Sequence, residues 1–82
     1  SEAVTLWESV VGPQIAKNAV AKKVENGMLY VEVSHSIWKT EIFHRKSQLL
    51  ERLNQALART SPGAPVVKEI FLVDPIRFRQ ES

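Results

Sequence analysis

The chain has 82 residues, of which 44% are hydrophobic and 24% are charged, which is enough for one hydrophobic core and too little for two. Because it contains no Cys, the sequence excludes a disulfide framework, thiolate zinc sites and cysteine nucleophiles, and it is compatible with the reducing cytoplasm in which we expect the protein. The formal net charge is only +2, so any attraction to nucleic acid must come from where the basic residues are placed.

The N-terminal segment carries the pattern of an amphipathic helix. Val4, Trp7 and Val11 follow one another at helical spacing, which predicts a helix of about three turns. Gly12 is expected to end this helix. Pro13 suits the first position of a short second helix, because its fixed φ matches the helical value and its missing N–H would be unpaired there anyway.

A β-hairpin is predicted where the apolar pattern changes to a period of two, from Val20 to Ser34. Asn26-Gly27 favours a two-residue turn, because a type I′ turn needs positive φ at both central residues. This turn predicts three cross-strand pairs whose side chains face the core: Val24 with Leu29, Lys22 with Val31, and Val20 with Val33. The opposite face, where Lys23 lies across from Tyr30, is expected to be a mixed, solvated surface.

A long helix is predicted from Ser36, whose hydroxyl is expected to cap it, to about Arg59. Its apolar side chains gather in one arc that is expected to lie on the sheet: Trp38, Ile42, Phe43, Leu49, Leu50, Leu53, Ala56 and Leu57. Lys39 and Lys46 project into the same arc. Either their stems extend past the sheet edge or the first half of the helix overhangs the core.

Residues 60–65 are rich in Pro and Gly and predict a loop, and residues 66–73 predict a third strand closed by Asp74-Pro75. Residues 76–82 give no firm prediction. The expected fold is α+β, with an N-terminal helix, a β-hairpin, a long helix and a third strand. Its small antiparallel or mixed three-stranded sheet is covered by helices, in one domain over residues 1–82 with a core at about 4–73. Residues 66–73 also read as an edge strand that is apolar on both faces, which invites a homodimer.

The expected core is drawn from every predicted element. Its members are Trp7, Val11, Ile15, Leu29, Val31, Val33, Trp38, Ile42, Leu49, Leu53 and Ile70. Phe43 and Phe71 also fit core roles better than exposed ones. Tyr30 is therefore the one aromatic side chain expected on the polar strand face.

Three arginines of the long helix, Arg45, Arg52 and Arg59, recur every seven residues and form a stripe beside the apolar arc. Such a stripe could follow the phosphates of a nucleic acid, each contact adding to affinity and to its salt dependence. A solvated flank, with Glu41 paired to Arg45 one turn away, explains the same pattern, and both interpretations stay open. If the hairpin adjoins this helix, a nucleic-acid footprint would also include Lys39, Lys46, Lys22, Lys23 and Tyr30.

Catalytic and metal chemistry find little support in the sequence. His35 and His44 lack a metal-binding spacing, and Ser36 suits a cap better than a nucleophile. The three Gly residues are isolated, so no glycine-rich phosphate loop exists. No apolar run reaches the about 18 residues of a membrane span, and the N-terminus lacks the order of a secretory signal. We therefore expect a binding protein without catalytic residues, metal, cofactor or membrane contact.

Four segments occur in a specific order: Trp7-x-x-Val10-Val11-Gly12-x-x-Ile15-Ala16, Gly27-x-Leu29-x-Val31-x-Val33, Ser36-x-Trp38-x-x-Glu41-Ile42 and Leu49-Leu50-x-x-Leu53-Asn54. Together they resemble the bacterial DciA family over about residues 4–73. The resemblance implies a KH-like fold in which Trp7 and Trp38 are core anchors, Gly12 ends a helix and Gly27 forms the hairpin turn. Two features depart from expectation: the GxxG loop with which KH domains grip RNA is absent, and Asn18-Ala19 stands where the family often has His followed by Thr or Ser.

The resemblance also implies a function. Members of the family are replication-initiation factors that associate with the DnaB-type replicative helicase and assist its loading onto DNA. We therefore expect a non-enzymatic helicase partner that contacts single-stranded or forked DNA through the arginine stripe. The alternative is a general single-stranded nucleic-acid-binding module without a helicase partner.

Overall fold

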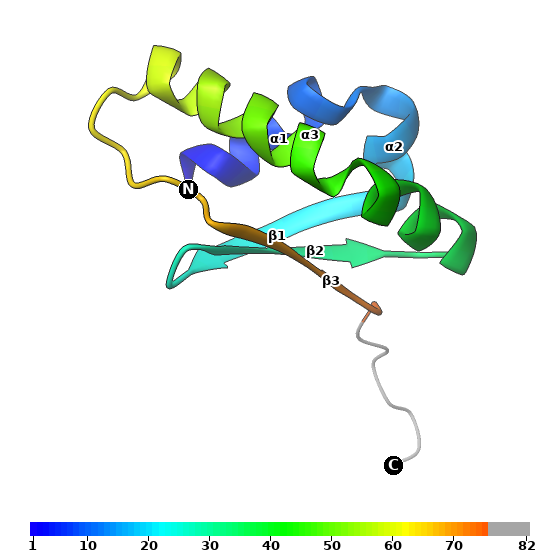
Figure 1. Ribbon diagram of the computed structural model, residues 1–82. Helices are drawn as coiled ribbons and strands as arrows, with labels where there is room; N and C mark the ends of the chain where they lie inside the picture. The colour runs from blue at the N-terminus through cyan, green and yellow to red at the C-terminus, as the bar shows by residue number, and fades with distance from the viewer. Residues whose placement is uncertain (76–82) are drawn as a thin grey trace.

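The computed structural model describes residues 1–75 of the 82-residue chain, so the predicted domain end and the segment 76–82 lie outside the described residues. The elements follow the order α1 (Glu2–Val11), α2 (Pro13–Asn18), β1 (Ala19–Glu25), β2 (Met28–Val33), α3 (Ser36–Thr60) and β3 (Glu69–Val73). The helices cover one face of the sheet, and no described helix covers the other (Figure 1). β2 is central, antiparallel to β1 and parallel to β3. The predicted α+β class and mixed three-stranded sheet are confirmed.

The first two helices meet at a sharp break that the sequence predicted. Gly12 ends α1 with φ of 91°, which a residue with a side chain rarely adopts, and Pro13 is the first residue of α2. On α1, before the break, Trp7 is 2% exposed. Its indole N–H donates a hydrogen bond of 2.9 Å to the carbonyl of Ala19, so the buried ring satisfies its one polar group while it anchors α1 to β1.

The hairpin turn is confirmed, but the register beyond it is partly wrong. Asn26 and Gly27 have φ of 54° and 81°, as a type I′ turn requires. The predicted pair of Val24 with Leu29 is present, and Lys23 lies across from Tyr30. The predicted pairs of Lys22 with Val31 and of Val20 with Val33 are absent.

A bulge at Lys22 explains the difference. The register shifts between Ala21 and Lys23, so that Ala21 pairs with Val31 and Ala19 with Val33. One extra residue reverses the faces of everything before it. Val20, predicted in the core, is therefore 48% exposed, and Ala21, predicted outside, is buried.

The start of α3 also differs from the prediction. Ser36 is the first helical residue and not the cap, which falls at His35, and no side chain caps this end. The carbonyl of His35 accepts hydrogen bonds from the backbone N–H groups of Trp38 and Lys39, at 3.0 and 3.2 Å. The end of the helix at Thr60 lies one residue beyond the predicted one.

Most of the expected core residues are buried between the sheet and the helices. Those that are buried are Trp7, Ile15, Leu29, Val31, Val33, Ile42, Leu49, Leu53 and Ile70, while Val11 and Trp38 are half-buried against them. The prediction of Phe43 and Phe71 as core residues is wrong, because they are 63% and 45% exposed. Phe43 comes directly after the fully buried Ile42, so its side chain points to the flank of the helix and not to the core. Phe71 follows the fully buried Ile70 on a strand, which turns it to the opposite face.

The third strand begins at Glu69 instead of residue 66. Asn54 of α3 accounts for the delay. Its side-chain carbonyl accepts from the N–H of Val67 at 2.9 Å, and its amide donates to the carbonyl of Val67 at 2.8 Å. The backbone of Val67 is therefore bonded to the helix and not to a strand.

Candidate interaction surfaces

The three arginines of α3 lie exposed along one flank of the helix, as the sequence predicted for a stripe. The guanidinium of Arg45 pairs with Glu41 at 2.6 Å. Arg52 and Arg59 form no ion pair with another residue in the range 1–75. Two of the three guanidinium groups are therefore not neutralised by the described part of the chain, and Arg45 is available to a phosphate only in competition with Glu41.

A groove lined by both apolar and polar residues adjoins this flank. It has a volume of about 650 Å³ and lies between the α1–α2 break and the first turns of α3. Ile37, 72% exposed, and the half-buried Trp38 line it on the helix side, while Gly12 and Pro13 line it on the other. Arg45 also lines the groove, so groove and arginine stripe form one continuous surface.

The groove was not predicted from the sequence. Its signals were Ile37, an apolar side chain outside the arc of the long helix, and the Gly12-Pro13 break, which turns α2 away from the line of α1. Only the packing of the break against α3 brings these features together.

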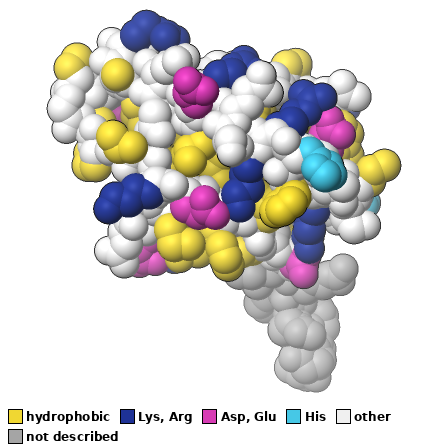
Figure 2. Space-filling model, viewed as in Figure 1, with side chains coloured by type: hydrophobic (Ala, Val, Ile, Leu, Met, Phe, Trp, Pro, Cys, Tyr) yellow, Lys and Arg dark blue, Asp and Glu magenta, His cyan; other side chains and the backbone are white. Residues whose placement is uncertain are grey.

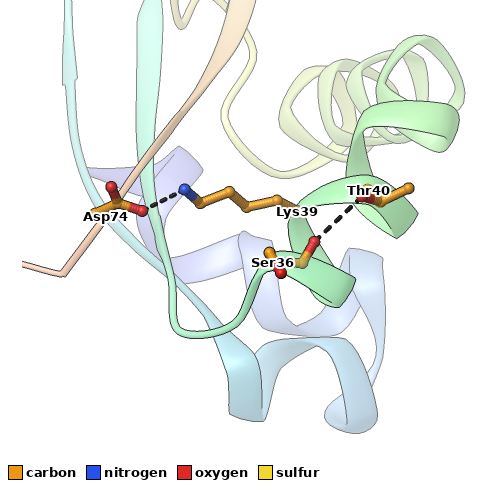
Figure 3. Close-up of polar contacts among 4 residues, drawn as sticks. All are labelled: Ser36, Lys39, Thr40 and Asp74. Atoms are coloured by element: carbon orange, nitrogen blue, oxygen red, sulfur yellow. Dashed lines mark hydrogen bonds and ion pairs between the residues drawn. The ribbon is translucent and has the colours of Figure 1, made fainter.

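Lys39 and Lys46 lie away from the arginines, on the flank of α3 that faces β3. Lys39 reaches across to an ion pair and hydrogen bond with Asp74, just after the strand (Figure 3). Lys46 pairs with Glu69, the first residue of the strand, at 3.0 Å. Their stems therefore extend past the sheet edge, one of the two arrangements that the sequence left open, and their charges are matched by carboxylates.

Lys22, Lys23 and Tyr30 lie on the sheet and not beside α3. The ammonium of Lys23 is 5.1 Å from the ring centroid of Tyr30 and 3.3 Å from the carboxylate of Glu25. Tyr30 also contacts Phe71 on the neighbouring strand, with ring centroids 5.5 Å apart in an edge-to-face arrangement. These residues belong to the open face of the sheet, which the helices leave uncovered (Figure 1).

The predicted nucleic-acid footprint is thus divided among three places: the arginine flank of α3, the seam between α3 and β3, and the open sheet face. The space-filling view shows Lys and Arg side chains interspersed with Asp, Glu and hydrophobic ones, without a continuous basic patch on that side (Figure 2). Within residues 1–75 no three His, Asp or Glu side chains gather as a metal site would need. Nor does any helix in that range have the length and apolar character of a membrane span.

The described residues thus form a small α+β domain in which a groove lies beside the arginine flank of α3 and the helices cover one face of the sheet. The chain belongs to the DciA family: the family model described as "Dna[CI] antecedent, DciA" matches residues 1–71. The chain is also 33% identical over 67 residues to a "UPF0232 protein" of Mycolicibacterium paratuberculosis (strain ATCC BAA-968 / K-10). That match covers 72% of this chain and 37% of the relative, so the chain spans little more than a third of the relative's length.

Proposed function

We propose that this chain is the folded domain of a non-enzymatic replication-initiation factor that binds the DnaB-type replicative helicase and assists its loading onto DNA. Membership of the DciA family, over residues 1–71, is the observation that carries the proposal. The surfaces fit the role of an adaptor, since the groove offers apolar contact to a protein and the neighbouring arginines offer charge to DNA.

The groove is the part that we assign to the helicase. Ile37 is the most exposed of the large hydrophobic side chains among the described residues. Exposed apolar side chains at the edge of a concave surface are typical of protein-binding sites, and burying one isoleucine contributes about 1.5–3 kcal/mol. The contact is therefore sufficient to change affinity by about ten- to a hundredfold.

The arginine flank is the part that we assign to DNA. Arg45 lies at the junction with the groove, so a helicase bound in the groove would be adjacent to DNA held by Arg52 and Arg59. Loading then follows from population shift: the domain binds the helicase state that accepts DNA more tightly than the closed state and raises the population of that state.

Binding of the purified replicative helicase to the full-length protein tests the proposal. We expect Ile37→Asp to weaken binding at least about tenfold, because it places a charge against an apolar contact. Val66→Asp is the matched control, since Val66 is 63% exposed and lies outside the groove. Equal binding by both variants would remove the groove from the proposal.

Absence of any helicase binding by the full-length wild type at micromolar concentrations would contradict the proposal as a whole. Retention of salt-dependent single-strand binding in that case would support the alternative, a general nucleic-acid-binding module without a helicase partner.

A further inference from the structure

We propose that the outer edge of β3 pairs two copies of this chain into a symmetric dimer, with Phe71 of each copy at the two-fold axis. No strand within residues 1–75 pairs with this edge. Figure 1 shows β3 at one side of the sheet, beneath α3. The inference stands on the sheet alone and does not depend on helicase binding.

The two edges of the sheet are built differently. β1 carries the bulge at Lys22 and two adjacent lysines, devices by which proteins prevent strand pairing at an edge. The strand β3 itself has no bulge, Lys or Pro, and four of its five residues, Ile70 to Val73, are apolar. The lysines that reach its two ends, Lys39 and Lys46, come from α3 and are paired with carboxylates. The edge formed by β1 is protected, and no strand among residues 1–75 pairs with the outer edge of β3.

The backbone of β3 fixes one register for such pairing. The N–H of Glu69 donates to the carbonyl of Gly27 at 3.2 Å, toward β2. Because alternate residues of a strand direct their backbone groups to opposite sides, Ile70 and Leu72 direct theirs outward. An antiparallel second copy centred on Phe71 pairs Ile70 of one copy with Leu72 of the other, so that every outward group on these two residues finds a partner.

Apolar side chains flank the open edge on both faces of the sheet. Phe71 is 45% exposed on the open face. On the helix side, Phe43 is 63% exposed, and the ammonium of Lys46, which pairs with Glu69 of β3, lies 5.7 Å from its ring centroid. Both aromatic rings therefore lie close to the edge strand, where a second copy would cover them.

The charges at the edge favour a second copy over an unrelated strand. One end of β3 holds the ion pair of Lys46 with Glu69, and the other holds that of Lys39 with Asp74. A two-fold axis places the N-terminal end of β3 in one copy beside the C-terminal end of β3 in the other. Each end carries one cation and one anion, so the ends match without like-charge excess, and each lysine can pair with either carboxylate.

Cysteine cross-linking tests the register directly, because the chain contains no native Cys. At the axis the two Phe71 residues form a non-hydrogen-bonded antiparallel pair, whose Cα atoms lie about 4.5 Å apart, within the disulfide range. We expect Phe71→Cys to form a covalent dimer rapidly under mild oxidation. Val20→Cys is the matched control: Val20 is 48% exposed, close to the 45% of Phe71, but it lies on β1, and we expect no dimer.

A mixed sample provides the second test. Glu69→Cys and Val73→Cys should cross-link with each other, because the register places these positions opposite. Neither variant should form a disulfide by itself. The same position in the two copies would be separated by four residues along the strands, which is about 13 Å. Failure of the mixed disulfide, or equal rates for Phe71→Cys and Val20→Cys, would overturn the proposal.

The unmodified chain supplies the third readout. Light scattering should show a mass that rises from monomer toward dimer with concentration, and Phe71→Lys should stay monomeric with an unchanged circular dichroism spectrum. A wild-type chain that remains monomeric up to millimolar concentrations would contradict the dimer.

Discussion

Asn54 shows how one side chain sets the limit of a strand. Its amide takes both backbone groups of Val67, the N–H and the C=O, at 2.9 and 2.8 Å. Val67 is 2% exposed, so these groups have little access to water. The hydrogen bonds therefore join the loop before β3 to α3.

We expect Asn54→Ala to lower the free energy of unfolding by about 2 kcal/mol, because it leaves two backbone groups without a partner. Urea denaturation monitored by tryptophan fluorescence measures this loss. Gln55→Ala is the control, since the neighbouring Gln55 is exposed and its removal should change stability by less than about 0.5 kcal/mol. Equal losses in the two variants would show that the Asn54 bonds contribute nothing.

At the scale of the elements, the bulge in β1 decides which residues meet the helices. It places Ala19 and Ala21 under α1 and α2 and sends Val20 to solvent. Two small residues in the core let α1 approach the strand closely enough for Trp7 to bond to the carbonyl of Ala19. An unbulged strand would put Val20 and Lys22 there instead.

Two lysine substitutions test which side chains of β1 point toward the helices. We expect Val20→Lys to change the free energy of unfolding by less than about 0.5 kcal/mol, because the new charge lies in water. Ala21→Lys should cost about 3 kcal/mol or more, because it buries an unpaired charge against the helices. Thermal or urea unfolding measures both, and the reverse order of losses would mean that the strand is regular.

On the scale of the whole molecule, the basic residues are separated by the sheet and by α3. Arg52 and Arg59 lie on one helix flank, while Lys22 and Lys23 lie on β1. Among the described residues, Arg52 and Arg59 have no ion pair and lie on the same helix flank, whereas on β1 Lys23 is paired with Glu25 and Lys22 has no ion pair.

Single-strand binding at several salt concentrations tests this separation with two variants of equal charge. We expect Arg52→Gln with Arg59→Gln to reduce the slope of log K against log salt by about 1.4, from about 0.7 per lost phosphate contact. Lys22→Gln with Lys23→Gln removes the same two charges and should leave the slope unchanged. The same reduction in both variants would mean that DNA responds to total charge and not to the arginine flank.

Local sequence patterns were sufficient to predict most of the fold. Gly12-Pro13 placed the break between the first two helices, and Asn26-Gly27 placed the hairpin turn, because both depend on the φ angles that these residues themselves allow. The arc of leucines in α3 predicted its buried face, since helical periodicity is a property of the helix alone. The order of segments also led to the DciA family, which the family match confirms.

Which side chains lie on each surface, and which of them are paired, could be decided only from the tertiary structure. Nothing near Lys22 signals that it is an extra residue, because a bulge is set by the fit of β1 to β2 and to the helices above. The sequence suggested that Lys39 and Lys46 could extend the nucleic-acid footprint, but the structure pairs them with Asp74 and Glu69, which the placement of β3 brings beside α3. The sequence by itself determined the elements, their turns and the family, because these follow from local backbone preference and residue order. Only the tertiary structure decided the groove and the ion pairs of Lys39 and Lys46, because each depends on residues that are distant in the chain and that meet only after packing.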